Sequence, residues 1–255
     1  YNKTLFLARD HLGVKPLFYS YKDDNLIFAS QIKALLANPM AEPVIDEEGI
    51  MEIFGLGPAR SLGSGIFKDI REIPPAHCLL YRDGNVNIKE YWKLEAKPHE
   101  DNFEQTRDTV RNLFVDAVER QLVSDVPLCT FLSGGLDSSA ISAVASNYFK
   151  EHNRGTLNTY SIDYRDNDKY FHSNLFQPTS DRFFAEKMSE YLKSSHRTVV
   201  LDNIELVEAL KDAVSANDLP GMADIDSSLL LFCREIRKDF TVALSGECAD
   251  EIFGG

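Results

Sequence analysis

The chain has 255 residues, of which 44% are hydrophobic, and its formal net charge is −13. This length and apolar content suit one large domain or two smaller ones with a buried core, and they exclude a disordered chain. The negative charge argues against a nucleic-acid or anionic-membrane partner, because both select a basic surface.

The first part of the sequence predicts mostly β-structure, with two helices. Short apolar runs bounded by turn residues predict strands at Thr4–Ala8, Leu17–Tyr21, Leu26–Ala29, Ala76–Arg82 and Asn85–Tyr91. The short polar segments between the second and third strands, and between the fourth and fifth, predict two hairpins. Helices are expected over Ile32–Leu36, capped by Ser30, and over Ile45–Phe54.

Strands and helices alternate in the second part of the sequence. The polar segment Lys93–Asn102 is the expected linker, and an amphipathic helix follows over Val110–Leu122. Further strands are predicted at Pro127–Leu132, Thr159–Tyr164, Thr198–Leu201 and Phe240–Leu244, with helices between them that include Ser138–Asn147 and Phe183–Leu192. This alternation implies a parallel sheet with helices on both faces. We therefore expect an α+β domain over residues 1–95 and an α/β domain over residues 96–255.

The sequence Leu128–Ala140 has the features of a phosphate-binding loop. An apolar strand leads into two glycines, and a helix is expected to start near Ser138. Glycines let the backbone approach an oxyanion, and the helix start offers unpaired N–H groups and a positive dipole end. The predicted phosphate-binding residues are Ser133, Gly134, Gly135, Ser138 and Ser139.

Asp137 is the unexpected residue of this loop. A carboxylate repels phosphates unless a cation lies between them, so Asp137 implies Mg²⁺ shared with phosphate oxygens. The alternative is a purely structural junction of strand, turn and helix, in which Asp137 caps the helix.

A second motif, Ser245–Gly255, follows the last predicted strand. Its Ser-Gly start places backbone donors at the carboxyl edge of the sheet, where ligands bind in doubly wound folds. Glu247, Asp250 and Glu251 lie so close in sequence that they repel unless solvated or bound to a metal. A solvated acidic turn is the simpler alternative.

These segments together resemble the glutamine-dependent asparagine synthetase family. SGGLDSS resembles the pyrophosphate loop of ATP pyrophosphatases, and SGECADEIFGG resembles the family's SGE-x-x-DE-x-FGG motif. Leu7–Tyr19, Phe28–Leu36 and Ile70–Leu80 resemble the later half of its glutaminase domain. The resemblance implies a partial N-terminal-nucleophile hydrolase domain, then a partial Rossmann-like ATP-pyrophosphatase domain. We expect the sequence to be an internal piece of a longer protein, inactive by itself and without glutaminase activity.

The resemblance also implies roles for single residues. Leu132 and Ile162 would frame the adenine and ribose with their backbones, and Ser245 and Gly246 would contact ATP. Glu247 would serve the acyl-transfer step, and Asp137 and Asp250 would hold Mg²⁺. Cys248 departs from the family, which usually has Gly there, and it would be strained if the backbone needs a positive φ. Arg9 and Asp10 are interpreted as structural residues that pin a turn by a salt bridge.

The implied reaction uses ATP, Mg²⁺, aspartate and glutamine. The aspartate side-chain carboxylate attacks the α-phosphorus, which gives β-aspartyl-adenylate and pyrophosphate. Ammonia from glutamine then displaces AMP and forms asparagine. Two alternatives stay open: a related adenylating ligase, such as a β-lactam synthetase or a peptide cyclase, and a non-catalytic remnant that binds nucleotide. The oligomeric state is open, with a homodimer as one option.

The cysteines suggest the compartment. Cys78, Cys129, Cys233 and Cys248 form no Cys-x-x-Cys pair, so we expect buried free thiols in a reducing cytoplasm. No apolar run reaches the length of about 20 residues that spans a bilayer, so no membrane partner is expected.

Overall fold

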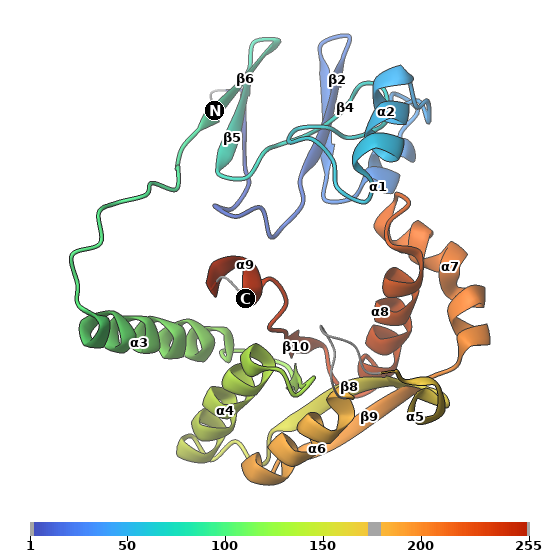
Figure 1. Ribbon diagram of the computed structural model, residues 1–255. Helices are drawn as coiled ribbons and strands as arrows, with labels where there is room; N and C mark the ends of the chain where they lie inside the picture. Colours follow the sequence, from blue (N-terminus) through green and yellow to red (C-terminus); the bar gives the residue numbers. More distant parts are fainter. Residues whose placement is uncertain (1–2, 173–179, 254–255) are drawn as a thin grey trace. The chain divides into compact units, whose positions relative to one another are not determined.

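The computed structural model describes residues 3–172 and 180–253 (Figure 1). The chain divides into two compact units. Unit 1 comprises Tyr1–Pro98 with Lys211–Ala223, and unit 2 comprises His99–Leu210 with Asp224–Gly255. Among the helices of the described residues, none combines the length and apolar character needed to cross a membrane.

Unit 1 contains two three-stranded antiparallel sheets. The first has the order β1-β5-β6 and the second the order β3-β2-β4. Their strands are β1 (Thr4–Ala8), β2 (Phe18–Lys22), β3 (Asn25–Ala29), β4 (Ile70–Glu72), β5 (His77–Arg82) and β6 (Asn85–Glu90). The five predicted strands are present within one residue at each end. β4 was not predicted, because three residues with a charged centre carry no readable alternation.

Both predicted hairpins of unit 1 are confirmed, and their turns explain why they form. Asp23 and Asp24 have φ values of 49° and 58°, and Asp83 and Gly84 have values of 49° and 77°. Positive φ at both central residues matches the right-handed twist of the flanking strands, and Asp, Asn and Gly tolerate it best. The turn chemistry therefore sets the strand register in each hairpin.

Within residues 3–98, unit 1 forms the helices α1 (Ile32–Leu36) and α2 (Glu47–Leu56). The prediction that Ser30 caps α1 is wrong, since Gln31 occupies the N-cap position and its side chain makes no capping hydrogen bond. α2 begins after Asp46, whose side chain accepts a hydrogen bond from the Gly49 N–H at 3.0 Å. The cap fixes the start of α2 two residues after the predicted one.

Arg9 and Asp10 are both structural, but they do not pair as predicted. Arg9 is buried, and its guanidinium lies 3.2 Å from the carboxylate of Glu72, which also pairs with Arg60 at 3.1 Å. Arg9 also donates to the carbonyl oxygens of Ile73, Gly13 and Lys15. The Asp10 carboxylate instead accepts from the backbone N–H groups of the loop that follows it, at Leu12, Val14 and Lys15. Two separate anchors therefore hold this loop.

Unit 2 is built on a four-stranded parallel sheet in the order β10-β7-β8-β9. The strands are β7 (Leu128–Phe131), β8 (Asn158–Tyr164), β9 (Ser195–Leu201) and β10 (Val242–Leu244). From β7 the chain adds strands in one direction through β8 to β9, and then returns to place β10 on the other side of β7. The strand order thus changes direction between β7 and β10, which is where doubly wound sheets bind ligands.

Helices cover both faces of this sheet, as predicted (Figure 1). On one face, α4 (Leu136–Glu151) packs on β7 and α6 (Asp181–Leu192) packs on β8 and β9, while α3 (Phe103–Gln121) packs on α4. On the other, Phe232 and Ile236 of α8 (Ala223–Ile236) pack with Cys129, Tyr160 and Val199. The remaining helices are α5 (Asn167–Tyr170), α7 (Asn203–Asn217) and α9 (Ala249–Phe253).

The start of α3 shows a cap that could have been predicted. The helix begins seven residues before the predicted one, directly after Asn102. The Asn102 side chain accepts from the Gln105 N–H, and the Gln105 side chain accepts from the Asn102 N–H, both at 3.0 Å. This reciprocal pair is a capping box, and its Asn-x-x-Gln spacing is visible in the sequence.

The cysteine prediction holds only in part. All four thiols are free, and Cys129 is buried in the core of unit 2, where burial raises its pKa to about 12. Cys78 is half-buried, whereas Cys233 and Cys248 are exposed. The expectation of burial is therefore wrong for the last two.

Glu72→Ala should destabilise the protein by about 3 kcal/mol, because it leaves the buried Arg9 charge without its carboxylate. Urea unfolding followed by circular dichroism measures the change. Asp116→Ala on α3 is the matched control, since its pair with Arg120 is exposed and should contribute less than about 1 kcal/mol. Equal losses of unfolding free energy in the two variants would contradict the assignment of Glu72 as a buried partner of Arg9.

Candidate active site

A cavity of about 470 Å³ opens at the carboxyl edge of the parallel sheet in unit 2. This volume lies in the range of small-molecule sites. One end of the cavity is polar and is formed by the two predicted motifs, through Ser133, Gly135, Asp137, Ser138, Ser245, Gly246 and Glu247. The other end is largely apolar and is formed by the sheet and α8, through Phe131, Tyr160, Ile162, Ile225, Leu229 and Phe232.

The first loop connects β7 to α4 and lines the polar end. α4 starts at Leu136, two residues before the predicted start at Ser138. The N-cap residue is Gly135, which has no side chain to bond the first N–H groups of the helix. Asp137 lies in the first turn, so the alternative that Asp137 caps the helix is wrong. The helix start therefore offers backbone donors toward the cavity, beside a carboxylate.

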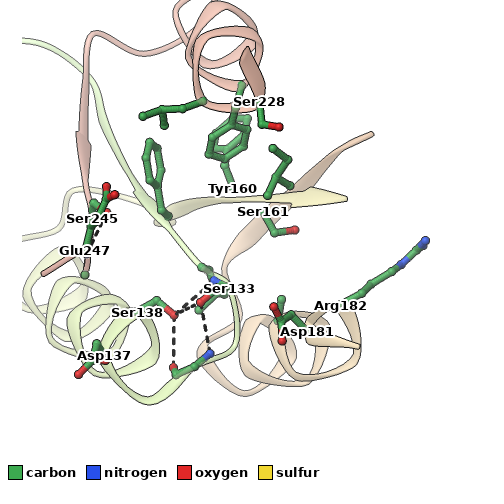
Figure 2. Close-up of a pocket in the computed structure, with 18 of the residues that line it drawn as sticks. Ser133, Asp137, Ser138, Tyr160, Ser161, Asp181, Arg182, Ser228, Ser245 and Glu247 are labelled. Carbon is green, nitrogen blue, oxygen red and sulfur yellow. Dashed lines mark hydrogen bonds between the residues drawn. The ribbon is translucent and has the colours of Figure 1, made fainter. Parts of the chain in front are cut away.

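Hydroxyl groups hold the first loop in shape (Figure 2). The Ser133 and Ser138 hydroxyl oxygens lie 2.9 Å apart. Ser138 also donates to the Gly135 carbonyl oxygen, and the Gly135 N–H donates to the Ser133 hydroxyl at 3.4 Å. These internal hydrogen bonds pre-organise the loop, which lowers the entropic cost of binding a ligand.

The two glycines of this loop have different roles. Gly134 has a φ of +90°, and a Cβ atom there would lie 2.5 Å from the backbone nitrogen of Ala185 on α6. Gly135 has a φ of −67°, which any residue adopts, and a Cβ atom there would meet only the Ser133 hydroxyl, at 3.5 Å. Gly134 therefore allows α6 to pack closely, while Gly135 leaves open space at the cavity wall.

The second loop meets the first one directly. β10 pairs with β7 in parallel, so both strands deliver their loops to the same edge. A Cβ atom on Gly246 would lie 3.1 Å from the Asp137 Cβ and 3.1 Å from the Ser138 nitrogen. In the second loop, the Glu247 N–H donates to the Ser245 hydroxyl at 3.2 Å. The two motifs, distant in sequence, thus form one surface.

The structure brings most of the predicted site residues to the cavity, but not all. Those that line it are Leu132, Ser133, Gly135, Asp137, Ser138, Ile162, Ser245, Gly246 and Glu247. Gly134, Ser139 and Asp250 are not among the lining residues. Asp250 lies in the first turn of α9, and no group of three or more His, Cys, Asp and Glu side chains in the described part of the chain is arranged to hold a metal.

The backbone N–H of Leu132 is not available to bind a nucleotide. Its N–H already donates to the Tyr160 carbonyl oxygen at 2.7 Å, within the hydrogen bonding between β7 and β8. The Leu132 amide is therefore not a free donor. Ile162 on β8 is 36% exposed as a residue, whereas Leu132 is fully buried.

Sequence reasoning missed the residues that α6 and α8 bring to the cavity. Arg182, the basic residue among the described lining residues, donates to Glu186 at 2.8 Å and lies 3.5 Å from Asp163. Figure 2 shows its side chain extending away from Ser133 and Ser138. On α8, Ser228 accepts from the Tyr164 hydroxyl at 3.0 Å. Neither helix carries a motif, and only the packing of α6 and α8 on the sheet reveals these contacts.

Cys248 confirms the strain expected from the sequence. Its φ is +69°, in the left-handed region that favours glycine. The residue follows Glu247 and precedes α9, so the strained backbone lies next to a lining carboxylate.

A cavity at the strand-order change of a parallel sheet, beside a loop with phosphate-loop geometry, is the arrangement typical of nucleotide-binding α/β proteins. The family model for asparagine synthase matches residues 109–255, and the model for the glutamine amidotransferase domain matches residues 1–92. The chain therefore belongs to the asparagine synthase family.

Curated relatives match along nearly the whole chain. It is 57% identical over 251 residues to glutamine-hydrolysing asparagine synthetase 3 of Bacillus subtilis, a match that covers 98% of the chain and 41% of that protein. The human glutamine-hydrolysing asparagine synthetase is 28% identical, over all of the chain and 44% of its own length. Amidase chry2 of Gibberella zeae is 25% identical, over 99% of the chain and 38% of its own length. The chain thus spans about two fifths of the length of these relatives.

Gly134→Ala should destabilise the protein by about 2 kcal/mol or more, since the new methyl group would collide with α6 and the positive φ would be strained. Gly135→Ala is the matched control and should cost less than about 1 kcal/mol. Thermal unfolding by calorimetry compares the two variants. Similar losses would show that close packing of α6 is not what requires a glycine here.

Cys248→Gly should stabilise the protein by about 1 kcal/mol, because glycine removes the strain of a side chain at positive φ. Cys248→Ala retains the Cβ atom and should give no such gain. Chemical unfolding of both variants provides the measurement, and a gain of equal size in Cys248→Ala would refute the strain.

Proposed function

We propose that the protein catalyses the ATP-dependent amidation of aspartate to asparagine, with glutamine as the nitrogen donor. One observation carries the proposal: the two Ser-Gly loops meet at the strand-order change, with Gly246 against Asp137 and Ser138. The family and the high identity to glutamine-hydrolysing asparagine synthetase 3 support the substrates. In this proposal, unit 2 belongs to a Rossmann-like ATP-pyrophosphatase domain over residues 96–255, and residues 1–95 belong to an N-terminal-nucleophile glutaminase domain.

The shape of the cavity suits a nucleoside triphosphate. The apolar end between the sheet and α8 would hold the adenine, near the backbone of Ile162. The hydroxyls of Ser133 and Ser138 and the first N–H groups of α4 would bind the phosphates, because a helix start attracts anions. Ser245 and Gly246 would contact ATP from the second loop. Gly134 and Ser139 would act through the loop backbone rather than at the cavity wall.

Carboxylates near the phosphates fit a hard divalent cation such as Mg²⁺. Asp137 lines the cavity beside the helix start, and Gly246 brings the second loop against it. In this proposal Asp137 would hold the ion from the cavity wall, and Asp250, which is not a lining residue, would reach it from the first turn of α9. Bound there, Mg²⁺ would neutralise the charge of the leaving pyrophosphate.

The side chains and backbone of this site would then perform two steps. First, an oxygen of the aspartate side chain attacks the α-phosphorus, and the bond between the α- and β-phosphates breaks to release pyrophosphate. Second, ammonia attacks the acyl carbon and AMP leaves. The phosphate loop stabilises the first leaving group, and Glu247 faces the acyl group in the second step. We assign no role here to the exposed thiol of Cys248.

The two alternative functions can also be tested. A related ligase, such as a β-lactam synthetase or a peptide cyclase, would share the adenylation step and differ in the acyl acceptor. A non-catalytic remnant would bind nucleotide without releasing pyrophosphate. Pyrophosphate release measured with aspartate and a panel of other carboxylic acids separates the three. A cytoplasmic location and a homodimer remain expectations.

Asp137→Asn should lower aspartate-dependent pyrophosphate release at least about 100-fold, because a neutral amide binds Mg²⁺ much more weakly than a carboxylate does. Glutamine hydrolysis by the complete protein should stay largely intact. Asp108→Asn on α3 removes a charge from the same unit and serves as the control. Normal pyrophosphate release in Asp137→Asn would refute the metal role.

A further inference from the structure

The face of the parallel sheet beneath α6 is unusually polar. β8 contributes Thr159 and Ser161 to this face, and β9 contributes His196 and Thr198, which are their register partners. Thr159 is fully buried and Ser161 is 7% exposed. A core position filled by hydroxyl groups and an imidazole costs stability unless every group is hydrogen-bonded. The hydrogen bonds among these groups therefore show how the buried polar side chains are satisfied.

Both ring nitrogens of His196 are bonded to hydroxyl groups of β8. Nδ1 lies 2.9 Å from the Thr159 hydroxyl oxygen, and Nε2 lies 3.0 Å from the Ser161 hydroxyl oxygen. Thr159 also bonds the Ser194 hydroxyl at 3.0 Å. Burial lowers the pKa of His196, an effect that outweighs the nearby carboxylate of Glu186. The imidazole is thus neutral at pH 7, with one nitrogen donating and the other accepting.

Ser161 connects this network to the candidate active site. It lines the cavity, whereas His196 does not. The Ser161 hydroxyl oxygen bonds His196 and also the Thr198 hydroxyl, at 3.1 Å. A serine hydroxyl can take part in three hydrogen bonds, one as donor and two as acceptor. Two are occupied on the protein side, which leaves one for a molecule in the cavity.

We propose that His196 is a positioning residue of the nucleotide site, acting through Ser161. Its Nε2 fixes the orientation of the Ser161 hydroxyl, so that the remaining hydrogen bond points to the bound nucleotide next to the Ile162 backbone. His196 itself does not touch the ligand. This inference rests on the proposed function, because it takes ATP as the occupant of the cavity.

Calorimetric titration of the protein with ATP and Mg²⁺ tests the proposal. Ser161→Ala should weaken ATP binding about 3- to 10-fold, the effect of one neutral hydrogen bond. His196→Ala should weaken it to the same extent. The double variant should bind no more weakly than either single variant, because residues that act through one contact are not additive.

Two conservative variants separate positioning from a structural role. The amide of His196→Gln can reach the place of Nε2 and bond Ser161, so its affinity should stay within about 2-fold of the unmodified protein. The shorter amide of His196→Asn can replace only Nδ1, toward Thr159, and should bind ATP as weakly as His196→Ala. Ser194→Ala changes the same network away from the cavity and is the matched control, with unchanged affinity.

Three results would overturn the proposal. They are unchanged affinity in Ser161→Ala, additive losses in the double variant, and equal losses in His196→Gln and His196→Asn. Melting temperatures of all variants show whether each is folded, and the small change in Ser161→Ala keeps the test valid if His196→Ala unfolds. If the unmodified protein does not bind ATP, both the proposed function and this inference are wrong. If it binds ATP and the variants bind with the same affinity, only the inference is wrong.

Discussion

Strands β7 and β10 are neighbours in the parallel sheet, and each is followed by a Ser-Gly loop at the same edge. The distance between these loops is set by Gly246, because a side chain there would press on Asp137 and the Ser138 backbone nitrogen. Everything proposed for the site depends on this close approach. It brings the start of α4, with its free N–H groups, against a second set of backbone donors and carboxylates.

The charge balance of the cavity follows from this arrangement. Asp137, Asp181 and Glu247 line it, together with the basic side chain of Arg182. Arg182 is already paired with Glu186 and Asp163. The carboxylates would repel a triphosphate at the polar end, and the helix start alone offers only a fraction of a charge. The proposed divalent cation would reconcile the proposed anionic ligand with these acidic residues.

Polar groups are buried in both units, but for different purposes. In unit 1, Arg9 and Glu72 form a buried ion pair that holds a loop, and their other bonds go to the backbone or to Arg60. In unit 2, the buried hydroxyls around His196 lead to a side chain in the cavity wall. A buried network that ends at a cavity can transmit geometry to a ligand, whereas one that ends in backbone carbonyls only fixes the fold.

The sequence by itself determined most of the elements, though not β4, and both loops of the site, because turn residues, glycines and apolar periodicity act locally. It also indicated the strain at Cys248, since a residue that replaces glycine is readable at a single position. It could not place the lining residues of α6 and α8, such as Arg182 and Ser228, because their role depends on which helix packs over the strand ends. It also could not show that Asp137 lines the cavity while Asp250 does not. Only the strand order and the packing of the helices decided those positions, since they arise from contacts between distant parts of the chain.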